Sequence, residues 1–432
     1  MKRDSSGGFA IQGVSGSSLL AASPRGTPFY AYDVDAMVGE LRDLAAAFGA
    51  RKHLIAFAVK ANSAGPIVTA LARAGAGADV VSGAELELAV RAGVPVGSII
   101  YSGVAKLNQE IDQALTAGGH GIAALQAESV EELPRIEARA RALGLRARVS
   151  FRVNPDIDAD THAHIATGHD EAKFGIPIED VGDAVELVIA SEHLDLVGVG
   201  NHIGSQLTST SSYADAARKV VTLFRAVDVS LATAARPKLR QIDFGGGFGV
   251  DYGAGCAVRP KDFAVELVTI TREQVSPDVT LVVEPGRSLV AAHGYLVASV
   301  VMDKRTRHRE PMRRWMMIDA GMNDLMRPAL YAAFHRIEPL DEFLLGEPNA
   351  EPTPTRVVGP VCESSDDFGV HPMGHRSPSA VVIRDAGAYG FTMASQYNGR
   401  ALPPELFVQG GRIAEVLVPP DASAWIASRF SE

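Results

Sequence analysis

The chain alternates between short apolar runs and segments in which apolar residues recur at helical spacing, and this alternation constrains its fold more than any other feature. Runs such as 54–59 and 121–125 are continuous rather than alternating with polar residues, as is typical of parallel strands buried on both faces. Eight such units predict a (β/α)8 barrel, with an open doubly wound sheet as the alternative. The predicted strands lie at about 54–59, 78–81, 98–101, 121–125, 147–153, 195–201, 239–243 and 279–284.

The texture of the sequence changes after about residue 286. Strand-like segments such as 295–301 and 357–361 are then separated by Gly, Pro and charged residues, and helical periodicity is scarce. We therefore predict two domains. The first is a barrel over residues 28–285, and the second is a mostly β domain, sandwich-like or barrel-like, formed by residues 1–27 together with residues 286–432.

Charge and cysteine content exclude several classes of protein. The formal net charge of -10 argues against nucleic acid or an anionic membrane as the main partner. The sequence contains no run of about 18 apolar residues, so we expect no membrane-spanning helix. It shows no apolar segment near its start, so we expect no signal peptide. Two cysteines do not make a disulfide framework or a zinc site of four cysteines. We expect a protein of the reducing cytoplasm, without a metal site.

Polar residues that follow the predicted strands would all face one mouth of a barrel. Lys60 follows the first strand, His202 the sixth, glycines 245–247 the seventh and Glu284 the eighth. Burial lowers the pKa of a lysine and makes its neutral amine a nucleophile or Schiff-base former. The alternative for Lys60 is an ordinary ion pair with Asp79 or Glu85.

The other groups at this mouth are weak signals when taken singly. Glycines 245–247 can bring backbone N–H groups to a phosphate, although such a run is more often a tight turn. Glu284 could bind a protonated pyridine nitrogen or be a capped carboxylate, and His202 alone would more often be a core histidine. Together with Lys60, these groups describe a pyridoxal-phosphate site.

The second predicted domain contributes further candidates. Arg327 and Tyr331 are four residues apart and would share a helical face. Cys362 and Glu363 follow a strand-like segment, and Tyr389 follows another. A free cysteine is usually a small core residue, so Cys362 as an acid has little support by itself.

Motifs across nearly the whole chain, from Gly26 to about Asn398, resemble the fold-type III pyridoxal-phosphate-dependent decarboxylases, and among them the diaminopimelate decarboxylases. Several independent motifs occur in the family's order, which makes chance agreement improbable. They are Ala58-Val59-Lys60-Ala61-Asn62, Asp79-Val80-Val81-Ser82, Lys173-Phe174-Gly175, His202-Ile203-Gly204-Ser205-Gln206, Gly245-Gly246-Gly247, Glu284-Pro285-Gly286-Arg287, Gly321-Met322-Asn323-Asp324 and Gly359-Pro360-Val361-Cys362-Glu363-Ser364.

The resemblance implies a barrel with a β domain, pyridoxal 5'-phosphate as cofactor, and decarboxylation of meso-diaminopimelate to L-lysine, the last step of lysine biosynthesis. Lys60 would form the Schiff base with the cofactor, His202 would stack on its ring, and Glu284 would bind its pyridine nitrogen. The phosphate and its surroundings would be bound by Ser205, Gly246, Gly247, Gly286, Arg287 and Tyr389.

The resemblance also implies a substrate site and a homodimer with composite active sites. Arg287, Arg327 and Tyr331 would bind the substrate's distal carboxylate, Glu363 its distal amine, and Tyr389 would contact the substrate as well. Cys362 would donate a proton from the partner subunit.

Departures from the family pattern and three rival functions stay open. Gly83-Ala84-Glu85 stands where Gly-Gly-Glu is frequent, Ser365 where Gly is frequent, and Gln396 where Asn is common, which leaves a related diamino acid open as substrate. The rivals are a decarboxylase of ornithine, lysine or arginine, a cofactor-binding paralogue without catalysis, and a racemase. Arg327 argues against the first, Lys60 with Cys362 against the second, and the 362–364 stretch against the third.

Overall fold

A computed structural model describes residues 8–155, 173–253, 255–256, 258–308, 312–340 and 353–430 of the chain. The chain divides into two compact units. The β unit comprises Met1–Met37, Asp251–Gly255 and Val290–Glu432, and the barrel unit comprises Val38–Val250 and Cys256–Leu289. None of the helices in the described ranges is long and apolar enough to cross a membrane.

Eight parallel strands of the barrel unit close on themselves. Strand β12 pairs with β4, and β10 pairs with both β8 and β11, so the ring has no free edge. The predicted (β/α)8 barrel is therefore confirmed, and the doubly wound alternative is wrong. The strands are β4 (His53–Ala58), β5 (Gly77–Val80), β6 (Ile99–Tyr101), β7 (Ala124–Ala127), β8 (Ala147–Asn154), β10 (Leu194–Gly200), β11 (Gln241–Asp243) and β12 (Thr280–Val283).

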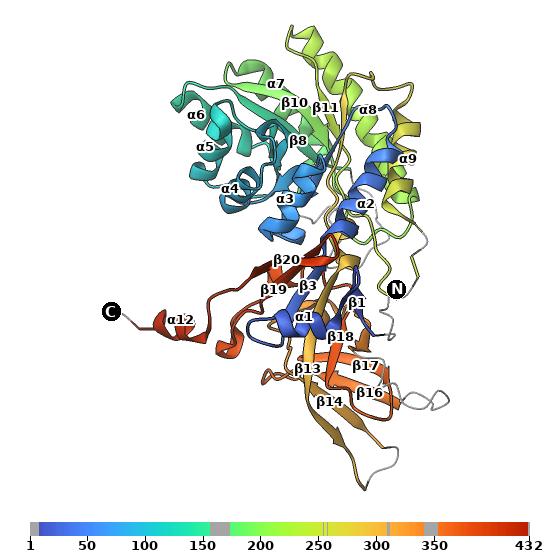
Figure 1. The fold of residues 1–432 in the computed structure, drawn as a ribbon. Helices are drawn as coiled ribbons and strands as arrows, with labels where there is room; N and C mark the ends of the chain where they lie inside the picture. Colours follow the sequence, from blue (N-terminus) through green and yellow to red (C-terminus); the bar gives the residue numbers. More distant parts are fainter. Residues whose placement is uncertain are drawn as a thin grey trace. The chain divides into compact units, whose positions relative to one another are not determined.

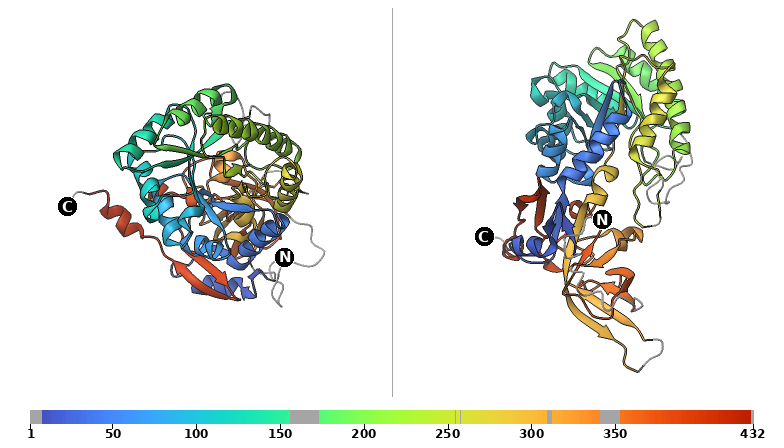
Figure 2. Two further views of the ribbon diagram at one scale, coloured as in Figure 1. Left: turned by 90° about the horizontal axis from the view of Figure 1, so that it is seen from above. Right: turned by 45° about the vertical axis from the view of Figure 1, so that its right-hand side comes forward.

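Helices surround the barrel strands, as Figure 1 and the left view of Figure 2 show. Each presents a buried apolar stripe to the strands, as in α8, where Val220, Phe224 and Val227 recur at helical spacing. Ala56, Ile100 and Val282, from three strands, form a buried cluster. The helices are α3 (Gly65–Arg73), α4 (Gly83–Arg91), α5 (Asn108–Thr116), α6 (Glu132–Ala142), α7 (Val181–Ala190), α8 (Ser211–Thr233) and α9 (Pro260–Thr271).

The β unit contains a sheet with the strand order β17-β16-β14-β13-β3-β19-β20, and β18 pairs with β13 and β15. The predicted mostly β second domain is confirmed. Its strands include β3 (Phe29–Asp33), β13 (Gly294–Arg305), β14 (Arg314–Ile318), β15 (Ile337–Pro339), β16 (Thr353–Val358), β17 (Asp367–Met373), β18 (Ala380–Ile383), β19 (Glu405–Gln409) and β20 (Arg412–Leu417). The β unit also contains β1 (Ala10–Ile11), β2 (Val14–Ser15), α1 (Gly16–Ala22), α11 (Arg327–Tyr331) and α12 (Ala422–Ala427), while α2 (Val34–Ala47) and α10 (Arg287–Val290) cross the unit boundaries. In the barrel unit, the two-residue strand β9 (Ile176–Pro177) pairs with β8.

Strand β3 lies in the β unit, although the sequence analysis placed the start of the barrel at residue 28. It pairs antiparallel with β13 and parallel with β19. Phe29 and Ala31 join Val297, Leu406 and Val408 in the buried core of this unit. The apolar run at 29–32 is thus buried against strands from the C-terminal part of the chain, which local sequence does not reveal.

Glu405, the first residue of β19, gives the β unit a pH-dependent stability. Its side chain is buried and accepts a hydrogen bond of 2.8 Å from the Tyr32 hydroxyl. Burial raises the pKa of Glu405 to about 7. The protonated form therefore persists in the folded state while the unfolded chain ionises, so this contribution is complete at acidic pH and is lost as pH rises through about 7.

We expect Glu405→Gln, which cannot ionise and keeps an acceptor for Tyr32, to remove this dependence. The free energy of unfolding of the variant minus that of wild type should increase by about 3 kcal/mol as pH is raised from 5 to 8. Urea unfolding of both proteins at the two pH values measures the difference. An equal stability difference at both pH values would show that Glu405 is already ionised in the folded protein.

Candidate active site

Lys60 lies at the carboxyl end of the first barrel strand, where β4 passes into the short 3-10 turn η1 (Val59–Ala61). Its Nζ donates a hydrogen bond of 2.8 Å to Asp79 Oδ2, in β5. The Asp79 side chain is fully buried, whereas that of Lys60 is 38% exposed. The ion pair weighed as an alternative for Lys60 is therefore present, and it holds the amine at the mouth of the barrel.

Two carboxyl groups at the ends of neighbouring strands form a buried acid pair. Glu284 follows β12 and Asp243 ends β11, and their side chains hydrogen-bond to each other. Burial, followed by the charge of Asp243, raises the pKa of Glu284 well above its usual value, and burial raises that of Asp243 to about 6. The Gly245 N–H donates to Asp243 at 2.8 Å. A cation bound at Glu284 would favour its ionised form.

His202 follows β10 and is held as a neutral imidazole. Burial, and then the charges of Arg152 and Lys60, lower its pKa well below the usual value. The Gly246 N–H donates to Nδ1 at 3.2 Å, so this nitrogen is unprotonated. A neutral ring beside Lys60 can stack on a planar ligand without adding charge.

The glycines that follow β11 pack closely against other backbone segments, so there is no room for a side chain at these positions. A side chain on Gly246 would clash with the Glu284 carbonyl, and one on Gly247 with the Gly204 carbonyl. Gly247 also has φ of +90°, a conformation that other residues adopt at a cost. Beside this turn, Arg287 Nη2 donates to Ser205 Oγ at 3.0 Å. Backbone N–H groups, a guanidinium and a hydroxyl in one region suit a phosphate.

We expect Gly247→Ala to lower the free energy of unfolding by about 2–4 kcal/mol, because strain and a backbone clash add. Gly182→Ala is the matched control. Gly182 lies in α7 with nothing within 4 Å of an added Cβ. The free energy of unfolding of the Gly182→Ala variant should therefore rise by up to about 1 kcal/mol. Guanidinium unfolding of the two variants measures both effects. Equal stabilities would mean that the turn relaxes to accept a side chain.

The residues of the barrel unit fit pyridoxal phosphate by the chemistry of their side chains. An amine for the aldehyde, a carboxyl for the pyridine nitrogen, a neutral ring and a glycine-lined anion cradle lie at the ends of successive strands. Among the described residues, Asp79 Oδ1 is buried without a hydrogen-bond partner, so the polar requirements of this mouth are not met by protein alone. The predicted residues in the barrel unit are Lys60, His202, Ser205, Gly246, Gly247, Glu284, Gly286 and Arg287.

The other five predicted residues belong to the β unit. Arg327 and Tyr331 begin and end α11, and Arg327 is buried. Cys362 and Glu363 are exposed on the loop between β16 and β17. Tyr389 follows β18 and has φ of +55°.

The exposed Cys362 loop is tied to a second loop of the same unit. The Tyr397 hydroxyl donates to Glu363 Oε1 at 2.6 Å, and the Cys362 N–H donates to Asn398 Oδ1 at 3.3 Å. These contacts fix the loop while leaving the Cys362 and Glu363 side chains open to solvent in a single chain. A free thiol in such a position is accessible to another molecule.

Sequence reasoning missed several groups that shape the barrel site. The sequence pattern places Asp243 at the end of a strand but assigns it no role in the site. It also does not predict the ion pair of Arg152 with Glu128, at 2.9 Å. Glu128 also accepts from the Gly103 and Gly175 N–H groups. Position at a strand end was the available signal for Asp243, since it follows the same rule that selected Glu284.

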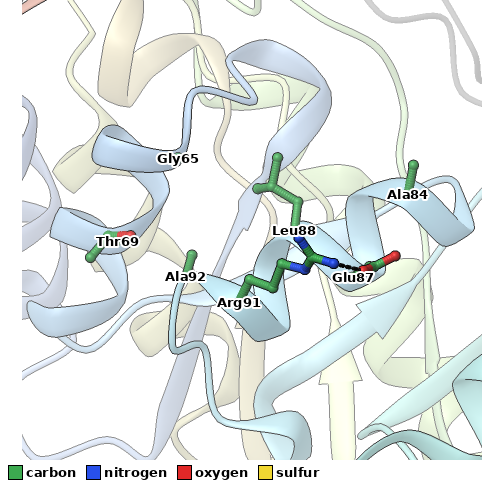
Figure 3. A pocket seen from close by; sticks show the side chains of 7 residues that line it. All are labelled: Gly65, Thr69, Ala84, Glu87, Leu88, Arg91 and Ala92. Atoms are coloured by element: carbon green, nitrogen blue, oxygen red, sulfur yellow. Dashed lines mark hydrogen bonds and ion pairs between the residues drawn. The ribbon is translucent and has the colours of Figure 1, made fainter. Parts of the chain in front are cut away.

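Two surface cavities of the barrel unit contain none of the predicted residues. One, of about 500 Å³, lies between α3 and α4; Figure 3 shows Thr69, Leu88 and Ala92 at its walls, and Arg91 reaching Glu87. Another, of about 720 Å³, is lined in part by residues at or near the amino-terminal ends of the strands, such as Lys52 and Thr280. Active sites of this fold lie at the other ends of the strands.

Comparison with known proteins identifies the family. The model of the pyridoxal-dependent decarboxylase pyridoxal-binding domain matches residues 34–291. A diaminopimelate decarboxylase of Pseudomonas aeruginosa is 38% identical over 393 residues, 90% of each chain. One from Helicobacter pylori is 39% identical and covers 90% of this chain and 91% of its own.

Solved structures agree over the whole chain. The H. pylori diaminopimelate decarboxylase complexed with L-lysine has a TM-score of 0.83 at 36% identity, covering 96% of this chain and 99% of its own. The M. jannaschii diaminopimelate decarboxylase has a TM-score of 0.87 at 32% identity, covering 100% and 98%. The similarity therefore includes the β unit, which the family model reaches only at its edges.

Proposed function

Because the chain belongs to the pyridoxal-dependent decarboxylases, we propose that it uses pyridoxal 5'-phosphate to convert meso-diaminopimelate to L-lysine and CO2, the last step of lysine biosynthesis. The observation that carries this proposal is the joint presence of Lys60, the Glu284–Asp243 pair and the glycine turn at one end of the barrel. Its similarity to diaminopimelate decarboxylases, extending through both units, supports the substrate.

The cofactor would be held by groups of the barrel unit together with Tyr389. Lys60 would bind it covalently, Glu284 would pair with its ring nitrogen and His202 would stack on its ring. Its phosphate is bound by Ser205, Gly246, Gly247, Gly286, Arg287 and Tyr389. When bound, pyridoxal phosphate supplies an electron sink for the carbanion left by loss of CO2.

The protein's own groups control charge and protons around that chemistry. Asp79 accepts a hydrogen bond from Lys60 Nζ at 2.8 Å and so holds the amine at the end of β4. Glu284 ionises when a cation stands against it, because an opposite charge offsets the burial that raises its pKa. His202, being neutral, neither competes for that carboxylate nor repels the ring.

We assign the distal end of the substrate to a set of charged groups. Arg287 and Arg327 would offer forked donors to its carboxylate, Tyr331 would bind the same group, and Glu363 would bind its distal ammonium. Tyr389 contacts the substrate as well as the cofactor. Lysine, ornithine and arginine lack the distal carboxylate and would leave these guanidinium groups without their partner.

We further propose a homodimer in which Cys362 of one subunit donates a proton in the active site of the other. The exposure of Cys362 and Glu363 in a single chain, on a loop fixed by Tyr397 and Asn398, supports this arrangement. We also propose that the enzyme works in the cytoplasm on a small-molecule substrate, with neither nucleic acid nor membrane as partner.

Selectivity tests the substrate assignment. We expect kcat/KM for meso-diaminopimelate to exceed that for L-lysine or L-ornithine by at least about 100-fold, because each buried donor left unpaired costs about 1–3 kcal/mol. Steady-state CO2 release from each amino acid measures the ratio. Comparable values for lysine would reject the substrate while leaving fold and cofactor in place.

A further inference from the structure

Arg327 of the β unit is held by a histidine, His335, that lies close to it because the chain reverses direction after α11. The short helix α11 ends at Tyr331, and the chain reverses at the next residue, Ala332, which has φ of +50°. The reversal places His335, which is 1% exposed, against the start of the same helix. Arg327 Nη1 and His335 Nε2 are 2.9 Å apart.

The hydrogen bonds of His335 define its protonation. An arginine has donors only, so Nε2 must be the acceptor and carry no proton. The other ring nitrogen, Nδ1, lies 2.9 Å from the Arg384 carbonyl, which only accepts, so Nδ1 carries the proton. Both contacts together require the neutral imidazole in one tautomer, and this orients the acceptor toward Arg327.

Tyr252 fixes the plane of the same guanidinium. Its ring lies 4.6 Å from Arg327 Cζ, a cation–π contact. The Tyr252 and His335 rings are 5.5 Å apart and inclined at 69°. Tyr252 comes from the segment Asp251–Gly255, which follows the barrel strand β11 in sequence but belongs to the β unit. Two segments distant in sequence from each other thus converge on one arginine.

The two contacts restrain Arg327 without adding a negative charge beside it. Arg336, in contrast, is held in a forked contact by the Asp385 carboxylate, at 2.7 and 3.0 Å. A carboxylate neutralises the arginine that it holds, whereas a neutral imidazole and a phenol ring orient a guanidinium without themselves neutralising it.

We propose that His335 and Tyr252 are positioning residues that orient Arg327 and so set the preference for an amino acid with a distal carboxylate. This inference rests on the proposed function, in which Arg327 binds that carboxylate. A guanidinium that is already oriented loses less conformational entropy when it forms a two-pronged contact. The expected signature is a change in affinity for the dicarboxylic substrate alone.

The test compares two ligands that differ in the distal carboxylate, using the cofactor-loaded enzyme. His335→Leu should raise KM for meso-diaminopimelate roughly 10-fold or more, because the donor loses its acceptor. The Ki of L-lysine as a competitive inhibitor and the kcat should stay within about twofold of wild type. His335→Gln, whose amide oxygen can accept, should restore much of the affinity. Tyr252→Leu should act like His335→Leu, and Tyr252→Phe, which keeps the ring, should not.

His371→Leu is the matched control for loss of a buried histidine. His371 is 1% exposed in the same unit and hydrogen-bonds to the Phe368 carbonyl at 2.9 Å. Whatever its stability, this variant should keep the wild-type ratio of KM to Ki. If His335→Leu and Tyr252→Leu leave that ratio unchanged, or if His371→Leu alters it as much, the positioning role is wrong.

Arg327→Met separates this inference from the proposed function. If it raises KM for meso-diaminopimelate and His335→Leu does not, only the positioning role fails. If Arg327→Met itself leaves KM unchanged, Arg327 does not bind the distal carboxylate, and its assignment fails together with the role of His335. Turnover of meso-diaminopimelate by the wild-type enzyme tests the overall function independently of both.

Discussion

Lys60→Ala is expected to reduce kcat/KM at least roughly a thousandfold and to remove the visible absorbance of the protein-bound cofactor. The amine is the covalent attachment point in our account, and it is held at 2.8 Å from Asp79 at the end of β4. Absorbance spectra of the purified variant after incubation with pyridoxal phosphate, together with CO2 release, measure the two effects.

Lys52→Ala is the matched control, because Lys52 precedes the same strand that Lys60 follows. Its Nζ donates to the Asp278 carbonyl at 3.1 Å, and it is exposed among residues that precede the strands. This variant should keep both activity and absorbance. A Lys60→Ala protein that retained both would show that the lysine is only an ion-pair partner for Asp79.

Mixing Lys60→Ala with Cys362→Ala is expected to restore activity that neither variant has alone. In a two-fold dimer with composite sites, each site takes Lys60 from one subunit and Cys362 from the other. A mixed dimer then carries both defects in one site and none in the other. With random exchange, activity should approach about a quarter of wild type, since half of the dimers are mixed and each has one intact site of two.

Subunit exchange must be shown separately, for example with two affinity tags on the two variants. If tagged heterodimers form and the mixture stays inactive, Lys60 and Cys362 act within one chain or Cys362 does not reach the site. If the Cys362→Ala homodimer is itself active, the Cys362 thiol is not the proton donor.

The barrel could be predicted because its strands carry their own signal. Parallel strands covered on both faces are mostly apolar, and β4 and β12 appear in the sequence as nearly continuous apolar runs. A short helix such as α5 carries a weaker signal, because it buries only three residues and is otherwise polar. The place of β3 was missed since its burial depends on β13 and β19, more than 250 residues later.

The residues of the candidate site also divide into those with a local signal in the sequence and those that depend on contacts made in the folded chain. Lys60, His202 and Glu284 could be predicted because a barrel brings the residues after its strands to one mouth. The acid pair of Glu284 with Asp243, and the support of Arg327 by His335, depend on side-chain contacts made only after folding. His335 lies just beyond the left-handed residue Ala332, a non-glycine position that sequence pattern does not identify as a reversal.

The central claim is tested most directly by the product formed from meso-diaminopimelate carrying labelled carbon in the carboxyl group of its D centre. The account predicts that the wild-type enzyme with pyridoxal phosphate releases the label as CO2 and forms one equivalent of L-lysine, since removal at the D centre leaves the L centre intact. Chiral chromatography of the amino acid, with trapping of the labelled gas, measures both products. Interconversion of diaminopimelate stereoisomers without CO2, or CO2 release only from lysine, ornithine or arginine, would contradict it.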